Sequence, residues 1–190
     1  MRTKWMLRKS ILGAVIGIAL ISTSLLAAPA NTLSTANTPV VLSDQQLADK
    51  VASAVRRYPY FDVFDWVTGS TKDGVVTLEG AVHQPFHKTD YGRLVAAIPG
   101  VKKVVNNLEV LPLSTFDDQL RRAAARAIYG DPSFVSLAMQ ANPPIHIIVE
   151  GGRIRLEGVV LNKMQRQVAE MNVRSRTMAF EVVNDLKTEA

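Results

Sequence analysis

The feature that most constrains the fold of this 190-residue chain is an internal repeat. When the sequence is displaced by 78 residues, the Leu-Glu-Gly run at 78–80 falls on the same run at 156–158, and the Val-Val-Asn run at 104–106 falls on that at 182–184. Upstream of these runs the displacement becomes 73, and the difference of five residues indicates an insertion within 133–143. The chain is therefore predicted to contain two copies of one structural unit.

Each copy begins with the pattern of an amphipathic helix. Apolar residues recur at i, i+4, i+7 and i+8, which places them on one helical stripe. They are Leu47, Val51, Ala54 and Val55 in the first copy, and Leu120, Ala124, Ala127 and Ile128 in the second. Ser43 with Gln46, and Thr115 with Asp118, have the spacing of a capping box. These pairs predict where the two helices begin.

Two strands, a second helix and a last strand follow in each copy. Apolar and polar residues alternate at 75–82 and 153–160, which is typical of a strand with one covered face. In copy two, the apolar positions of the predicted second helix are Met164, Val168 and Met171. The predicted fold class is α+β: two tandem α-β-β-α-β repeats, each a small three-stranded mixed sheet with two helices packed on one face. Five glycines are expected to be structural, because turns favour residues that tolerate positive φ; they are Gly74, Gly80, Gly100, Gly152 and Gly158.

Residues 1–30 divide as a secretory signal peptide does. Four basic residues precede an uninterrupted apolar run at 11–21, and Ala-Pro-Ala at 28–30 offers small residues to a signal peptidase. We expect cleavage there and secretion to the periplasm, because this run is shorter than the roughly 20 residues that span a bilayer. An uncleaved N-terminal anchor is the alternative. Residues 31–42 lack charge and periodicity and are expected to form a flexible tether.

The net charge of +5 does not indicate a nucleic-acid binder. The chain has 22 Lys+Arg against 17 Asp+Glu, but the first thirty residues hold four basic residues and no acid, so the remainder has a net charge of only +1. Nonspecific DNA binding depends on many phosphate contacts, which such a chain does not supply. The chain also has no cysteine, which excludes disulfides, thiol catalysis and cysteine metal sites.

Two runs in each copy resemble the BON (bacterial OsmY and nodulation) domain. In the first copy they are the Gly-Val-Val-Thr-Leu-Glu-Gly-Ala-Val run at 74–82 and the Ile-Pro-Gly-Val-Lys-Lys-Val-Val-Asn-Asn-Leu stretch at 98–108. The second copy matches at 152–160 and 182–186, but it reads Thr-Met-Ala at 177–179 where the first copy reads Pro-Gly-Val.

The resemblance implies one BON domain at 43–111, a linker at 112–115 and a second BON domain at 116–188. It also implies a non-enzymatic protein of the periplasm or cell envelope that binds phospholipid or supports the envelope under osmotic stress. The alternative is a protein-interaction or stress-protective scaffold that binds envelope proteins through an open sheet face (Thr77, Glu79, Arg155 and Glu157) or through the groove between the repeats.

No catalytic motif, phosphate loop or nucleophile elbow is visible, so we expect neither enzymatic activity nor a cofactor. His83 and His87, with Asp90, are the best metal candidates. However, Pro85 lies between the two histidines at a strand-to-helix junction, and no third strong ligand or zinc spacing is visible. We therefore expect solvated loop histidines and no metal site.

Two stretches contain candidates for binding anionic phospholipid or a partner. An aromatic run at 58–66 lies beside two arginines, as in interfacial patches, although core packing explains most of that run. The helix at 117–129 carries arginines opposite its apolar stripe, and a solvated face is the alternative interpretation. The candidate residues are Arg56, Arg57, Tyr60, Trp66, Arg121, Arg122 and Arg126.

Overall fold

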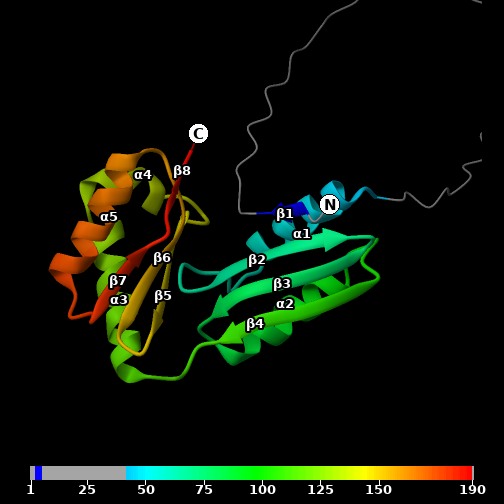
Figure 1. The fold of residues 1–190 in the computed structure, drawn as a ribbon, viewed down its shortest axis with the longest axis horizontal. Coiled ribbons are helices and arrows are strands. Elements are labelled where there is room, and N and C mark those ends of the chain that lie inside the picture. The colour runs from blue at the N-terminus through cyan, green and yellow to red at the C-terminus, as the bar shows by residue number, and fades with distance from the viewer. Residues whose placement is uncertain (1–2, 6–41, 190) are drawn as a thin grey trace, which may run out of the picture.

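The computed structural model describes residues 3–5 and 42–189. They form two units that lie side by side, each with helices packed against a mixed β-sheet (Figure 1). Both units run helix, strand, strand, helix, strand. The predicted α+β class with two α-β-β-α-β repeats is therefore confirmed.

The first unit is built around the central strand β3. Its elements are α1 (Asp44–Arg56), β2 (Trp66–Lys72), β3 (Val75–Val82), α2 (Pro85–Ala96) and β4 (Lys103–Val110). Strand β3 pairs antiparallel with β2 and parallel with β4, so α2 lies in the crossover between parallel strands.

A fourth strand, β1 (Thr3–Trp5), pairs antiparallel with the outer edge of β2. The sequence pattern did not predict this strand. The apolar run at 11–21, on which the predicted signal peptide depends, lies outside the described residues, as does the tether except for its last residue.

The second unit repeats this topology and adds short elements. Its elements are α3 (Thr115–Tyr129), η1 (Pro132–Phe134), α4 (Val135–Ala138), β5 (Ile145–Glu150), β6 (Arg153–Val160), α5 (Lys163–Arg176), β7 (Glu181–Asn184) and β8 (Lys187–Thr188). The insertion predicted within 133–143 contains α4 and part of η1. In the part of the chain that the structure describes, no helix is long and apolar enough to cross a membrane.

Side-chain caps determine where the leading helices begin. Ser43 and Gln46 form the predicted capping box at the start of α1. The prediction for α3 was wrong by one residue, because Ser114, and not Thr115, accepts the hydrogen bond from the Asp117 amide.

An aspartate in the first turn of each leading helix also holds the following β-hairpin. The Asp44 carboxylate accepts a hydrogen bond from the Asp73 amide at 3.1 Å. At the equivalent position, Asp117 accepts hydrogen bonds from the amides of Gly151 and Gly152 at 3.1 and 2.8 Å. The repeat thus preserves a long-range contact between helix and hairpin as well as the element order.

The two units share a joint. In the loop before β2, the Val63 carbonyl accepts a hydrogen bond from the Ile147 amide of β5 at 2.7 Å. A small apolar cluster lies at the same joint, with Trp66 packed against buried residues from both units: Ala81, Leu111 and Ile148. The loop at 61–65 therefore connects the first sheet to the second.

Candidate functional site

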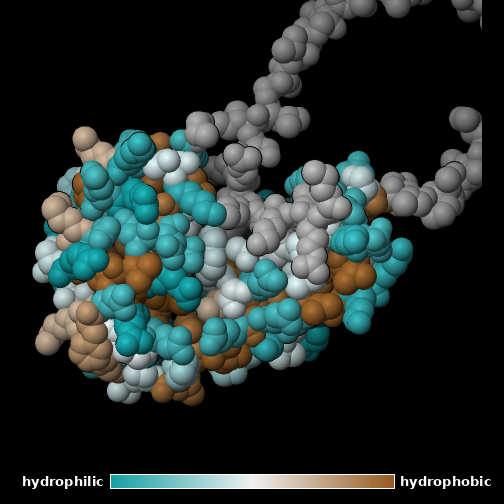
Figure 2. Space-filling view, viewed as in Figure 1, coloured by the Kyte–Doolittle hydropathy of each residue, from teal (hydrophilic) through white to brown (hydrophobic). Residues whose placement is uncertain are grey.

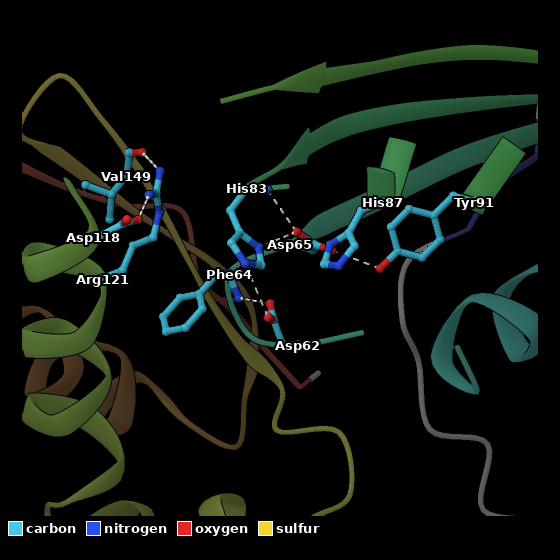
Figure 3. Close-up of polar contacts among 9 residues, drawn as sticks. All are labelled: Asp62, Phe64, Asp65, His83, His87, Tyr91, Asp118, Arg121 and Val149. Carbon is cyan, nitrogen blue, oxygen red and sulfur yellow. Dashed lines mark hydrogen bonds and ion pairs between the residues drawn. The ribbon is translucent and has the colours of Figure 1, made fainter. Parts of the chain in front are cut away.

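The most concentrated polar chemistry of the described residues surrounds the Asp65 carboxylate, beside the joint (Figure 3). Asp65 immediately precedes β2 and is fully buried. Its Oδ1 accepts hydrogen bonds from the backbone amide and the ring Nδ1 of His83, both at 3.0 Å. Its Oδ2 accepts hydrogen bonds from His87 Nδ1 at 2.6 Å and from the Tyr91 hydroxyl at 3.0 Å. We name Asp65, His83, His87 and Tyr91 the Asp65 cluster.

The start of α2 brings these side chains together. His83 lies between the end of β3 and Pro85, the first residue of the helix. His87 and Tyr91 lie four residues apart on the buried face of α2, so both side chains point in the same direction. His83 lies outside the helix and reaches the same carboxylate from there. Pro85 between the two histidines therefore does not keep them apart.

The expectation of solvated loop histidines was therefore wrong. The side chain of His87 is only 3% exposed and that of His83 only 13%. Asp90, the acid considered with them in the sequence, lies outside the cluster and pairs with Tyr58 and Arg93. The acid that does meet both histidines is Asp65, which lies 18 residues before His83 and has no periodic relation to it.

Electrostatics in the cluster favour an ion pair. Burial by itself raises the pKa of Asp65, but the hydrogen bonds from the His83 ring and amide outweigh burial and hold this pKa below its ordinary value. For His83, burial lowers the pKa, but the hydrogen bond to Asp65 and the nearby Asp62 carboxylate raise it above its ordinary value. His83 Nε2 lies 3.7 Å from Asp62 Oδ2, so this ring lies between two carboxylates.

One predicted binding residue is structural. Arg121 is 3% exposed, and its guanidinium donates to the Val149 carbonyl at 2.6 Å and to Asp118 at 2.6 Å. It is therefore not available to a lipid headgroup, which corrects the assignment of this arginine to an exposed face. Arg122 and Arg126 of α3 are exposed.

The predicted aromatic patch divides into an exposed and a half-buried part. Trp66 is half-buried at the joint, where its ring packs near His146. Tyr60 is 63% exposed and contacts the ring of Phe86, which is 48% exposed. Arg57 is exposed nearby in the sequence, and Arg56 is half-buried.

Two of the three apolar positions that the sequence pattern gives for α5 are exposed. The core-facing residues of α5 are Ala169, Asn172 and Val173, whereas Met164 and Met171 are 72% and 60% exposed. Beyond the helix end, Met178 and Phe180 are 81% and 78% exposed. Figure 2 shows apolar side chains among hydrophilic ones along the outer edge of this unit.

Helix α5 is also positively charged. Helix α5 carries four cationic residues and a single acidic residue, Glu170. The cations are Lys163, Arg166, Arg174 and Arg176. We name Met164 and Met171 together with Lys163, Arg166 and Arg174 the α5 face; Arg176 instead reaches toward the end of α3, where it contacts Ala127 and Asp131. A seven-residue spacing of methionines in a basic helix was visible in the sequence, where these residues were identified only as apolar helix positions.

Comparison with known proteins bears on the first unit. Residues 43–112 match the BON domain model. No curated protein matches the chain significantly in sequence.

Two solved structures of CdsD, a structural protein of the type III secretion system of Chlamydia trachomatis, resemble the chain weakly. The first has 13% identity and a TM-score of 0.29, and the match spans 75% of this chain and 92% of the CdsD chain. The second, the C-terminal domain of CdsD, has 12% identity and a TM-score of 0.28, and the match spans 78% of this chain and 100% of the CdsD chain. Scores this low support no inference about this chain.

Proposed function

We propose that this chain, whose first unit is a BON domain, is a non-catalytic envelope protein that binds anionic phospholipid surfaces and thereby supports the envelope under osmotic stress. The observation that carries the proposal is the α5 face, where exposed methionines stand among three cations and one acid.

The two kinds of side chain on the α5 face suit the two layers of a membrane surface. Methionine is flexible and apolar, so Met164 and Met171 can enter the boundary between headgroups and acyl chains. Each cation near an anionic surface contributes about 1 kcal/mol. Arg174 pairs with Glu170 at 2.9 Å, so part of this attraction is already used within the protein. We therefore expect moderate, salt-sensitive binding.

The first unit offers a second contact of the same kind. Phe86 lies in the first turn of α2, at the position that corresponds to Met164 in the first turn of α5. With Tyr60 it forms an exposed aromatic pair. The repeat thus exposes an apolar side chain at the start of the second helix in both units.

The test is sedimentation of residues 31–190 with liposomes of increasing anionic lipid content, at low and high salt. The apolar run at 11–21 is omitted because it would insert by itself. We expect binding that increases with anionic lipid and decreases with salt, and that weakens at least tenfold in a Met164→Asp/Met171→Asp variant.

Met139→Asp is the matched control, because Met139 is 83% exposed in the insertion and lies outside the α5 face. Absence of binding to strongly anionic vesicles at low salt would contradict the proposal. Equal binding by the double variant and the wild type would contradict the assignment to the α5 face.

A second function, binding of an envelope protein, is favoured by the edge of β2. That edge already accepts an extended segment, since β1 pairs with it from Thr3↔Thr71 to Trp5↔Gly69. If the segment before residue 31 is removed, β2 becomes an open edge that can accept a strand from a partner. A photo-crosslinker at Ser70, on this edge, should then capture a specific envelope protein that the same crosslinker at Met139, exposed in the insertion, does not.

A further inference from the structure

We propose that Asp65, His83 and His87 bind one divalent transition-metal ion of the zinc type. The site is independent of the lipid-binding function proposed above. It would join the loop at 61–65 to the start of α2.

The ligand set has the chemistry that such an ion selects. Two imidazole nitrogens and a carboxylate oxygen are common ligands of zinc, and a water molecule completes a four-coordinate site. One ligand atom from each of the three residues lies within 4.8 Å of the others. Both histidines direct Nδ1 toward the Asp65 carboxylate, at 3.0 and 2.6 Å. An ion placed among these atoms would replace the ring protons that now hold them together.

Groups that orient the ligands are also present. Histidine ligands usually direct their second ring nitrogen to a carboxylate or carbonyl, which fixes the ring. His83 Nε2 lies 3.7 Å from Asp62 Oδ2, so Asp62 is suited to this role. The Tyr91 hydroxyl and the His83 amide both donate to Asp65 and hold its carboxylate in position. Burial of Asp65 and His87 would limit exchange of the ion with solvent.

The second unit shows that the fold itself does not require these residues. The helices α2 and α5 begin 78 residues apart, and the pairs Val67↔Gly80 and Ile145↔Gly158 show the same displacement. Asp65, His83, His87 and Tyr91 thus correspond to Pro143, Leu161, Gln165 and Ala169. The same turn is built there with no titratable side chain at any of these four positions. A buried carboxylate with two histidines costs desolvation energy, so its presence in only one copy points to a ligand.

The location gives the ion a mechanical consequence. The loop that carries Asp65 also carries Val63, whose carbonyl holds the second unit at Ile147. An ion bound to Asp65 and to His87 of α2 would immobilise this loop against the helix. Metal binding is therefore expected to stiffen the joint between the units as well as to stabilise the first unit.

The test is metal binding by the full-length chain, purified without a histidine tag and treated with a chelator. Titration calorimetry with Zn²⁺ should give one ion per chain, Co²⁺ should give visible d–d absorption bands, and Zn²⁺ should raise the unfolding temperature. Two variants copy the residues of the second unit, His83→Leu and His87→Gln, so that each substitution is one that the fold accepts at the corresponding position. Each should weaken Zn²⁺ binding at least about 100-fold.

His146→Gln is the matched control, because it removes the only other histidine, which is not a member of the Asp65 cluster. Circular dichroism without metal establishes that each variant is folded. The proposal is overturned if the folded wild type binds no Zn²⁺, if His83→Leu and His87→Gln bind it as the wild type does, or if His146→Gln abolishes binding.

Discussion

The carboxylate of Asp117, in the first turn of α3, accepts a hydrogen bond from the backbone amide of Gly152 at 2.8 Å, across 35 residues of sequence. Asp117 is 2% exposed and also accepts from Gly151, so it connects the helix to the hairpin between β5 and β6. This contact places the leading helix over its sheet.

Removal of this contact should destabilise the second unit. Asp117→Ala leaves the buried amide of Gly152 and the part-buried amide of Gly151 without an acceptor, and we expect a loss of about 2–3 kcal/mol in the free energy of unfolding. Asp44→Ala removes a single exposed hydrogen bond and should cost only about 1 kcal/mol. Urea denaturation followed by circular dichroism measures both values. Equal losses in the two variants would contradict the role of burial.

Gly158 should not tolerate a side chain. Its φ is +122°, and an added Cβ would lie 1.9 Å from the carbonyl oxygen of Pro144, the residue before the neighbouring strand β5. Backbone would have to move, so Gly158→Ala should cost at least about 3 kcal/mol. Gly151→Ala is the control, because its φ is +56° and nothing lies within 4 Å, so only about 1 kcal/mol of backbone strain is expected. The midpoints of urea unfolding distinguish the two outcomes.

The joint can be tested through Leu111. This residue is 2% exposed in the cluster with Ala81 and Ile148, and Leu111→Ala should cost about 2–4 kcal/mol. Trp66 packs against the same cluster and is the only tryptophan of residues 31–190, so its fluorescence should shift to the red as the joint loosens. Leu113→Ala should change neither quantity, because Leu113 is 79% exposed two residues further on. An unshifted spectrum in Leu111→Ala would show that Trp66 does not report on the joint.

The stability of the chain should depend on pH through His146. Burial lowers the pKa of this histidine from 6.5 to about 4, and its Nδ1 has no hydrogen-bond partner among the described residues. The unfolded chain takes up a proton below about pH 6.5, whereas the folded chain resists protonation until about pH 4. The stabilisation from this group is therefore complete above pH 6.5 and is lost as the pH falls toward 4, by roughly 3 kcal/mol in total.

The measurement is urea unfolding of wild type and His146→Gln at several pH values between 4 and 7.5, with EDTA present. Contributions from other titrating groups are common to both proteins and cancel in the difference. The variant should lose less stability on acidification than the wild type does. Parallel profiles would mean that His146 does not titrate in this range.

Local patterns predicted the elements of this fold well. The stripe that begins at Leu47 and the capping box of Ser43 identified α1, and the displacement of 78 residues correctly matched β3 and α2 to β6 and α5. These signals depend on neighbours in the chain, because helical and strand periodicities are set by local backbone geometry. For the same reason, the repeat could be recognised without knowledge of any contact.

The candidate site was predicted poorly, because its residues meet through tertiary packing. Asp65 has no periodic relation to His83 and His87, and it reaches them only because β2 and β3 pair antiparallel. Arg121 adjoins the apolar stripe of α3, and its burial depends on the Val149 carbonyl of a strand that begins 24 residues later.

The sequence by itself therefore determined the α-β-β-α-β order and its duplication, since both are encoded in local periodicity and turn residues. Only the tertiary structure decided that a carboxylate and two histidines converge, and that Met164 and Met171 remain exposed. Which stripe of α5 is buried depends on the angle at which the helix meets the sheet, and that angle is determined by long-range packing of side chains.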